Sequence, residues 1–290
     1  MYDEEVYEKY RKAGEILKEV KNEAIPMIKK EESILKVAEF VEKKIVEMGG
    51  GIAFPCNISR NEEAAHSTPQ RNDERVFEDD MVKLDIGVHV DGYIADSAIT
   101  IDLSGNPELV RASEEALKAA IEIVEAGVNT SEIGDVIETA IKSEGFRPIY
   151  NLTGHGLMRY IPHAPPPIPN KKVPHGVELL EGVVIAIEPF ATDGVGKVVD
   201  SEKVEIFQTV SNSMARLPMV RKLQKELKKY NTLPYAKRWL PPEKLEFALS
   251  NLQKLGIVRG YPVLKEVSGG LVSQAEHSLI VLDGGCEVIT

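Results

Sequence analysis

The sequence has very few cysteines and no long apolar run. Only Cys56 and Cys286 occur in 290 residues, which is too few for a disulfide framework, and neither stands in a Cys-x-x-Cys pair. The apolar runs fall far short of a bilayer span, and the opening stretch MYDEEVYEKYRKAGEIL is charged where a signal peptide needs apolar residues. We therefore expect two ordinary thiols, no membrane partner and a cytoplasmic protein.

Basic residues are in the minority along the chain as a whole. Asp and Glu number 46 against 35 Lys and Arg, which gives a formal net charge of -11. An acidic total argues against a protein that binds nucleic acid over its whole surface. The length of 290 residues fits one large domain or two small ones, and 43% hydrophobic residues is enough to form a packed core.

Helical and strand patterns alternate in a way typical of an α+β domain. Apolar residues at spacings of three and four predict a helix that ends near Gly49, and further helices are expected over residues 107–127 and 131–145. Turn residues separate the expected strands, which are 51–59, 82–90, 93–103, 147–154, 182–190, 196–207, 270–282 and 286–290. We therefore expect a largely antiparallel sheet with paired helices.

One segment differs from the rest of the chain in its charge. Residues 211–260 contain eleven Lys or Arg against three Glu. The pattern is helical over 219–230 and 241–256, and a connection with proline separates the two stretches. We interpret this segment as an insertion between two strands of the main domain.

The stretch LDIGVHVDGYIADSA, residues 84–98, predicts a tight β-hairpin. Asp91-Gly92 is a strong signal for a two-residue turn, which pairs Val90 with Tyr93. The register that follows places one apolar face toward the helices. Its pairs are Val88 with Ala95, Ile86 with Ser97, Leu84 with Ile99 and Val82 with Ile101.

The other face of this hairpin brings two aspartates together. Asp85 and Asp96 are diagonal neighbours in this register, about 7 to 8 Å apart between backbones, and the small residues Gly87 and Ala98 leave room between them. Two carboxylates so close repel each other, so that one takes up a proton unless a cation lies between them. A solvated polar face is the alternative, and further ligands decide between the two.

Three more candidate ligands stand in apolar or glycine-rich surroundings. Glu188 ends the run VVIAIEP and Glu276 lies within LVSQAEHSLIV, where a charged residue is seldom unpaired. Glycines on both sides of His155 allow close approach of its ring to a metal. With Asp85 and Asp96, these residues form an oxygen-rich set with one imidazole, which suits a pair of cations such as Mn, Fe(II) or Co and also admits Zn.

With these five residues in order, the chain resembles the type II methionine aminopeptidases of the pita-bread metallopeptidase family over essentially its whole length. Other stretches that carry the resemblance are GIAFPCNIS, AAHSTP, IPHAPPPIPN, EPFATDGVGKV and SQAEHS. The helical insertion marks type II, and the short N-terminal part resembles that of archaeal members. The resemblance implies a pita-bread (creatinase/aminopeptidase) catalytic domain of residues 1–208 and 263–290, with residues 209–262 as a basic helical insertion subdomain.

The resemblance also implies roles for the five residues. Asp85, Asp96, His155, Glu188 and Glu276 are the expected ligands of two divalent metal ions (Co, Mn, Fe(II) or Zn), with Asp96 bridging them and Glu188 also acting as proton shuttle. Two metal ions that share a water lower its pKa toward neutral pH. The implied reaction removes the N-terminal methionine from nascent proteins and favours a small second residue.

Two histidines and an apolar slot are expected to contact the substrate. By their match to AAHSTP and IPHA, His66 lies near the scissile amide and His163 near its carbonyl, both as catalytic groups. Phe54 and Tyr261 match positions that line the first-residue pocket, and Pro162 adds an apolar wall, with core packing as the alternative for all three. Flexible, polarisable methionine fills such a slot well.

Two positions depart from the family pattern. Gly156 follows His155 where relatives often carry a bulkier residue, and Pro162 stands before His163 where type II enzymes commonly have a branched apolar residue. Neither position is an expected ligand. The departures therefore bear on the shape of the pocket more than on activity.

Two other functions stay open at this point. An Xaa-Pro aminopeptidase or dipeptidase of the same fold uses similar ligands, but such relatives usually carry an extra domain ahead of the catalytic one, whereas Asp85 here follows one helical stretch and a strand. Some pita-bread proteins have lost their metals and act as binding modules, and the five intact ligands argue against that. A monomer is the family's usual form and is expected here.

The basic insertion suggests a second partner. An enzyme that trims nascent chains works at the ribosome, whose surface is largely phosphate, and a cationic cluster would give a weak, salt-sensitive contact. A solvated helical face is the alternative. The cations concerned are Arg221, Lys222, Lys225, Lys228, Lys229, Lys237 and Arg238.

Overall fold

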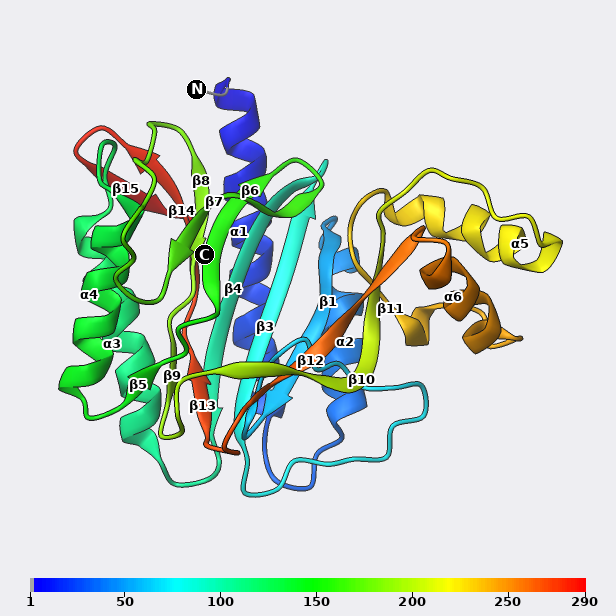
Figure 1. Ribbon diagram of the computed structural model, residues 1–290, viewed down its shortest axis with the longest axis horizontal. Coiled ribbons are helices and arrows are strands. Elements are labelled where there is room, and N and C mark those ends of the chain that lie inside the picture. The colour runs from blue at the N-terminus through cyan, green and yellow to red at the C-terminus, as the bar shows by residue number, and fades with distance from the viewer. Residues whose placement is uncertain (1–2) are drawn as a thin grey trace.

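The computed structural model describes residues 3–290, which form helices and strands throughout (Figure 1). The α-helices are α1 (Glu4–Ala24), α2 (Ile34–Glu47), α3 (Pro107–Ile123), α4 (Thr130–Ser143), α5 (Pro218–Leu227) and α6 (Leu245–Lys254). Short 3-10 helices are η1 (Ile25–Met27), η2 (Lys228–Tyr230) and η3 (Lys237–Trp239). Within this described part, no helix has both the length and the apolar character needed to cross a membrane.

The strands belong to four antiparallel sheets. In chain order they are β1 (Gly51–Arg60), β2 (Glu63–Ala65), β3 (Met81–Val90), β4 (Tyr93–Asp102), β5 (Arg147–Pro148), β6 (Thr153–Met158), β7 (Ile161–Pro169), β8 (Val184–Ile187), β9 (Phe190–Thr192), β10 (Val198–Thr209), β11 (Tyr235–Ala236), β12 (Val258–Glu266), β13 (Val272–Gln274), β14 (His277–Leu282) and β15 (Gly285–Val288). The sheet orders are β1-β3-β4, β15-β14-β8-β6-β7, β11-β10-β12-β2 and β13-β9-β5. The predicted α+β class with antiparallel pairing is confirmed.

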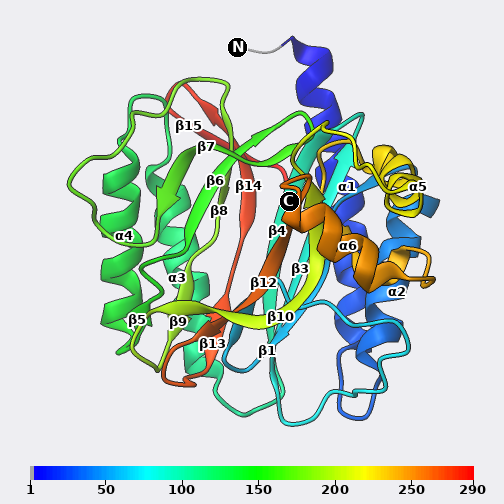
Figure 2. The ribbon, with the colours of Figure 1, turned by 45° about the vertical axis from the view of Figure 1, so that its right-hand side comes forward.

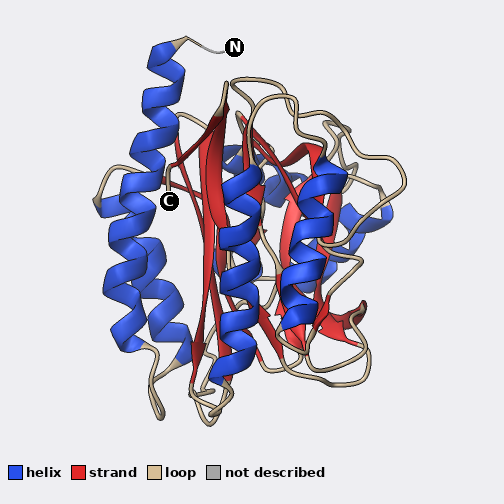
Figure 3. Ribbon diagram, turned by 90° about the vertical axis from the view of Figure 1, so that its left-hand side faces the viewer, coloured by secondary structure: helices blue, strands red, loops and turns tan. Residues whose placement is uncertain are grey.

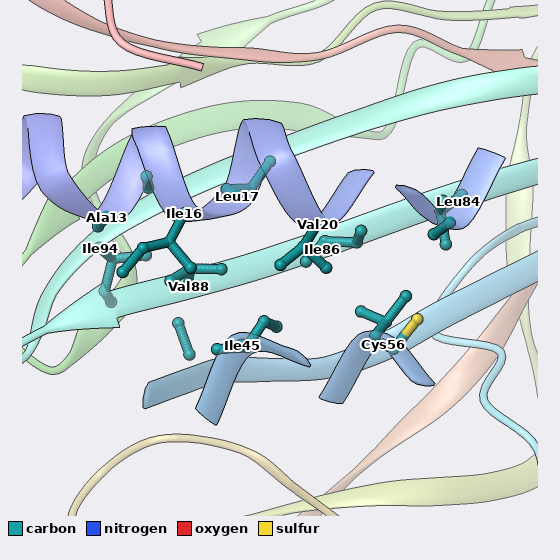
Figure 4. Packing of buried hydrophobic residues seen from close by; sticks show 14 of the residues in the cluster. Ala13, Ile16, Leu17, Val20, Ile45, Cys56, Leu84, Ile86, Val88 and Ile94 are labelled. Carbon is teal, nitrogen blue, oxygen red and sulfur yellow. The ribbon is translucent and has the colours of Figure 1, made fainter. Parts of the chain in front are cut away.

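Two helix pairs cover these sheets, as the sequence predicts. Helices α1 and α2 pack on β1, β3 and β4, with α1 behind β3 and β4 in Figure 1, and α3 and α4 pack on the other half, as the side view in Figure 3 shows. In the first half, Ile16 and Val20 of α1 lie over Val88 and Ile86 of β3 (Figure 4). Each such buried side chain stabilises the fold by about 1.5–3 kcal/mol relative to exposure.

The central hairpin has the register predicted from the sequence. Asp91 and Gly92 form its turn with φ angles of +52° and +89°, as a type I′ turn requires. Val90 pairs with Tyr93, and every further pair down to Val82 with Ile101 follows the prediction. The turn chemistry and the alternation of apolar residues therefore suffice to fix which face carries the aspartates.

Three predicted strands are wrong in their continuity, because each is divided in the structure. The stretch 182–190 breaks after β8 at Glu188, where Pro189 lacks an N–H for the ladder, and 270–282 breaks between β13 and β14 at Glu276. The stretch 147–154 likewise breaks between β5 and β6. Strands β8 and β14 belong to the five-stranded sheet, whereas β9 and β13 belong to a three-stranded one, so both glutamates lie where the chain passes between sheets.

The residues between β10 and β12 form α5, η2, β11, η3 and α6, which project at the right of Figure 1 and come forward in Figure 2. The two helices share an apolar cluster, to which Val220 and Leu223 of α5 and Leu249 and Leu252 of α6 contribute. This cluster also includes Phe207 of β10, so the helices pack on the strands from which they emerge.

The expectation that Arg238 belongs to an exposed cationic cluster is wrong. Its side chain is only 4% exposed and forms an ion pair with Glu42 of α2. Trp239 donates from Nε1 to the same carboxylate at 2.8 Å. A buried carboxylate needs such partners, so Arg238 anchors the helical segment to the body of the protein. Lys237 is also engaged, since its Nζ lies 2.6 Å from Glu246.

Candidate metal centre and substrate cavity

All five predicted ligands line one cavity of about 240 Å³. Asp85 stands on β3, Asp96 on β4 and His155 on β6, and the two glutamates stand at the strand breaks described above. The divided strands matter here because a residue between two sheets can turn its side chain away from both ladders. The structure thus brings together candidate ligands from four parts of the chain, which are the hairpin, β6 and the two strand breaks.

Backbone hydrogen bonds fix the position of Glu276 against the hairpin. Its N–H donates to the carbonyl of Ala98 at 3.0 Å, and Ser97 Oγ donates to its carbonyl at 2.7 Å. Ser97 Oγ in turn accepts from the buried Lys21 Nζ at 2.6 Å. On the same strand the N–H of Asp96 donates to Ser278 Oγ at 2.8 Å. The strand carrying Asp96 and the segment carrying Glu276 are therefore locked together.

Side-chain distances within the cavity are those of a cation site. One ligand atom each from Asp96, His155 and Glu276 lies within 4.8 Å of the others. His155 Nε2 is 3.4 Å from Glu188 Oε1. Gln274 Nε2 lies 3.3 Å from Asp85 Oδ2 and 3.4 Å from Glu188 Oε2, so that this amide connects the two remaining carboxylates.

The electrostatics of the four carboxylates are unfavourable without a cation. Burial raises the pKa of Asp85 to about 6. Burial and then the charges of neighbouring carboxylates raise the pKa values of Asp96, Glu188 and Glu276 well above their usual range. Within residues 3–290, no lysine or arginine forms an ion pair with any of the four. Like charges held this way repel strongly.

Divalent cations fit the donors that this cavity offers. Asp96 Oδ1 and Glu276 Oε2 are buried and make no hydrogen bond in the described part of the chain, so both have lone pairs to give. Burial lowers the pKa of His155 to about 4, which keeps the ring neutral and able to coordinate. Four carboxylates with one imidazole and no thiolate suit Mn, Fe, Co or Zn ions.

Four aromatic rings form a wall beside the carboxylates. The ring centre of Phe54 lies 5.7 Å from that of His66, 5.8 Å from that of His163 and 5.3 Å from that of Tyr261. The ring centre of His163 also lies 4.7 Å from that of His155, so the wall adjoins the candidate metal site. Phe54 and Tyr261 thus line the same cavity as the two histidines.

His66 has an uncommon backbone conformation. Its φ angle is +64°, which few non-glycine residues adopt, and its Nδ1 lies 3.3 Å from the carbonyl oxygen of Pro262. Burial lowers its pKa to about 4, so the ring is neutral near pH 7. A neutral imidazole both donates and accepts a hydrogen bond, and the Pro262 carbonyl accepts the proton of Nδ1 in the tautomer that leaves Nε2 as an acceptor.

Pro162 lies outside the cavity. It is buried on β7 and does not belong to the residues that line the site, because neighbouring strand residues such as His163 point to the opposite face. The apolar wall expected from Pro162 is therefore not found there. Residues that sequence reasoning missed include Leu152 and Leu264, which take part in the lining.

Two missed polar residues contact the carboxylates. Gln274 stands two residues before Glu276, and this spacing is the signal that could have placed its amide on the same side of the chain. Asn57 of β1 pairs with Asp85 across the ladder, and its side chain helps to moderate the raised pKa of that carboxyl. Both amides interact with the candidate ligand Asp85.

Comparison with known proteins agrees with this geometry. Residues 8–211 match the model of metallopeptidase family M24. A methionine aminopeptidase of Archaeoglobus fulgidus is 56% identical over 99% of both chains, and one of Thermococcus onnurineus is 47% identical over 96% of this chain and 97% of its own. The crystal structure of methionine aminopeptidase from Thermotoga maritima shares the pita-bread fold with a TM-score of 0.74, at 23% identity over 100% of this chain and 98% of its own. The chain therefore belongs to metallopeptidase family M24 and, within it, to the methionine aminopeptidases.

Proposed function

We propose that this chain removes the N-terminal methionine from nascent polypeptides as a type II methionine aminopeptidase. The observation that carries the proposal is the single cavity in which four buried carboxylates and His155 adjoin an aromatic wall. The 56% identity to a methionine aminopeptidase favours this activity over Xaa-Pro hydrolysis. The helices between β10 and β12 support the type II assignment, and we propose residues 209–262 as a separate insertion subdomain. A monomeric state and a cytoplasmic location stay predictions.

We further propose that the five cavity residues hold two divalent cations, with Co, Mn, Fe(II) or Zn as candidates. Asp85, Asp96, His155, Glu188 and Glu276 would be the ligands, and Asp96 would contribute to the binding of both ions. When bound, such a pair activates a water and polarises the carbonyl of the scissile bond. Unpaired oxygens on Asp96 and Glu276 support this assignment.

The protein's own residues then orient the substrate and move protons. The positively charged amino terminus of the peptide is drawn to the carboxylates, which fixes the cut after the first residue. Glu188 takes a proton from the attacking water and returns it to the departing amine, so the oxygen of water enters the methionine carboxyl. Neutral His66 contacts the scissile amide and His163 contacts its carbonyl oxygen.

Phe54 and Tyr261 receive the first side chain in this proposal. Their rings, with Ile206, form a small buried apolar cluster beside His66 and His163. A flexible thioether adapts to such a slot and makes favourable contacts with aromatic rings. Core packing is the alternative role for both residues, and truncating either ring would then lower stability without changing which first residue is released.

Hydrolysis of defined peptides tests the proposed activity. We expect release of free methionine from Met-Ala and Met-Gly peptides, with kcat/KM for a Met-Lys peptide lower by about 10- to 100-fold because a long second side chain crowds the cavity. The measurement is chromatographic detection of the released amino acid. Preferential cleavage of Xaa-Pro peptides would contradict the proposal and favour the proline-specific relatives.

We also propose that the insertion contacts the ribosome weakly through its exposed lysines. Lys222, Lys225, Lys228 and Lys229 are exposed, and none of them forms an ion pair with a carboxylate within residues 3–290. Arg238 and Lys237 are left out because both are engaged in ion pairs. A solvated helical face is the alternative explanation for these charges.

Changing the four exposed lysines to glutamate should reduce co-sedimentation with ribosomes at low salt. The physical reason is the loss of phosphate contacts, whose contribution also falls steeply as salt rises in the unchanged protein. Hydrolysis of a short Met-Ala peptide should stay the same. A control variant carries the same change at Lys12, Lys36, Lys43 and Lys118, which are exposed outside the insertion. Equal sedimentation of both variants and the parent would show that the insertion is structural.

A further inference from the structure

A cation without an acidic partner stands at the edge of the substrate cavity. Arg259 lies on β12 two residues before Tyr261, and alternate residues of a strand point to the same side. Because Tyr261 lines the cavity, the Arg259 side chain points to the same side of the strand, nearer to solvent. It is exposed there. Its side-chain partners within residues 3–290 are the neutral groups of Gln208 and Tyr261.

Two hydrogen bonds hold the guanidinium group in place, and a third joins its two partners. Arg259 donates from Nε to Gln208 Oε1 at 2.8 Å and from Nη2 to Tyr261 Oη at 2.7 Å, and Tyr261 Oη donates to Gln208 Oε1 at 2.8 Å. The guanidinium carbon also lies 4.9 Å from the centre of the Tyr261 ring. Arginine has five N–H donors, so most of them stay available to an anionic group. Arg259 is therefore a positioned cation with donors to spare.

The expected path of the substrate passes close to this cation. The Tyr261 ring lies 5.2 Å from His66 and 6.0 Å from His163, the two histidines assigned to the scissile bond. Arg259 stands two positions before Tyr261, about 7 Å along the strand at the usual rise, and an extended peptide advances about as far in two residues. The third and fourth residues of a bound polypeptide consequently come within reach of Arg259.

We infer that Arg259 attracts acidic side chains of the bound polypeptide beyond its second residue. Substrates with Asp or Glu at the third or fourth position are therefore favoured. This inference rests on the proposed function and adds a substrate preference to it. Arg259 acts on binding and stands away from the reacting atoms, so its effect belongs in KM. A cation that is already held in place loses less side-chain entropy on binding a carboxylate than a free one.

An exposed carboxylate near the cavity could also select substrates by charge, but it would favour basic side chains where Arg259 favours acidic ones. Asp200 of β10 pairs with Leu264 of β12, on the other side of Tyr261 from Arg259. Its side chain is exposed and makes no hydrogen bond or ion pair to residues 3–290. If Asp200 selected the substrate, peptides with Lys or Arg would be favoured. The charge of the preferred peptide therefore distinguishes a role of Asp200 from a role of Arg259.

The test compares peptides that differ at one position, Met-Ala-Glu-Ala, Met-Ala-Gln-Ala and Met-Ala-Lys-Ala, with the metal-loaded protein at low salt. We expect kcat/KM for the Glu peptide to exceed that for the Lys peptide by about fivefold, through KM, as befits one exposed charge pair. The ratio should approach one at high salt. It should also approach one in Arg259→Gln and keep its native value in Lys254→Gln, which removes an exposed cation of α6.

Each other outcome overturns the inference in a recognisable way. If Arg259→Gln lowers kcat/KM equally for all three peptides, the arginine only supports Tyr261. If the native protein prefers the Lys peptide and Asp200→Asn removes that preference, Asp200 reads the charge instead. If none of the peptides releases methionine, the proposed function itself fails, and the inference falls with it.

Discussion

Asp96→Asn should lower kcat/KM for a Met-Ala peptide by more than about a hundredfold. Changes to groups that merely support metal ligands cost about 10- to 100-fold in metal affinity or activity, so the loss of a proposed ligand itself should exceed that range. Asp96 is one of the four carboxylates that line the cavity, and one of its oxygens is buried and makes no hydrogen bond in the described chain. The measurement combines steady-state kinetics with the metal content of the purified variant.

Thermal unfolding separates a lost ligand from a damaged fold. Without metal, Asp96→Asn should unfold at the same temperature as the parent or higher, because it removes one of four mutually repelling buried carboxylates. With metal, the variant should gain less stability than the parent. Asp91→Asn is the matched control, since it makes the same change in the same hairpin and Asn-Gly also suits its turn. Full activity of Asp96→Asn would remove Asp96 from the ligand set.

His66→Ala and His163→Ala should each lower turnover by about 10²- to 10⁴-fold while both metal ions stay bound. Neither ring belongs to the proposed ligands, and both stand in the aromatic wall next to the site. Turnover from single-substrate kinetics and metal content by elemental analysis give the two readouts.

His175→Ala is the control for both histidine variants, because His175 is exposed in a loop away from the cavity and should be replaceable without effect. The assignment is wrong if metal is lost from His66→Ala or His163→Ala, since the ring concerned would then be a ligand. Normal turnover in either variant would exclude that histidine from the reaction.

The register of the central hairpin was predictable from sequence because two local signals agree there. Asp91-Gly92 fixes the turn, and alternate apolar residues fix the buried face, so Asp85 and Asp96 necessarily share the other face. The breaks at Glu188 and Glu276 were not predictable in the same way. Pro189 is a local signal for the first break, but Glu276 has no proline or glycine beside it, and in both stretches the change of sheet depends on partners far away in the chain.

The candidate ligands could be recognised in the sequence because they are charged, whereas the neutral residues that contact them could not. A carboxylate in an apolar strand is costly unless it has a partner, which is why Glu188 and Glu276 stood out. Gln274 and Asn57 are neutral amides and carry no such signal, although both contact the carboxylates. Charge alone was misleading at Arg238. Its place in a basic segment predicted a surface cation, but the fold buries it against Glu42.

Titration of the metal-stripped protein tests the central claim most directly. Chelation should abolish hydrolysis of a Met-Ala peptide, and Mn, Fe(II) or Co should restore it, with calorimetry showing two ions bound per chain as activity returns. We expect this because Asp85, Asp96, His155, Glu188 and Glu276 offer donors for cations, and no Lys or Arg of the described residues forms an ion pair with their carboxylates. Full activity in protein shown by elemental analysis to be free of metal would contradict the account.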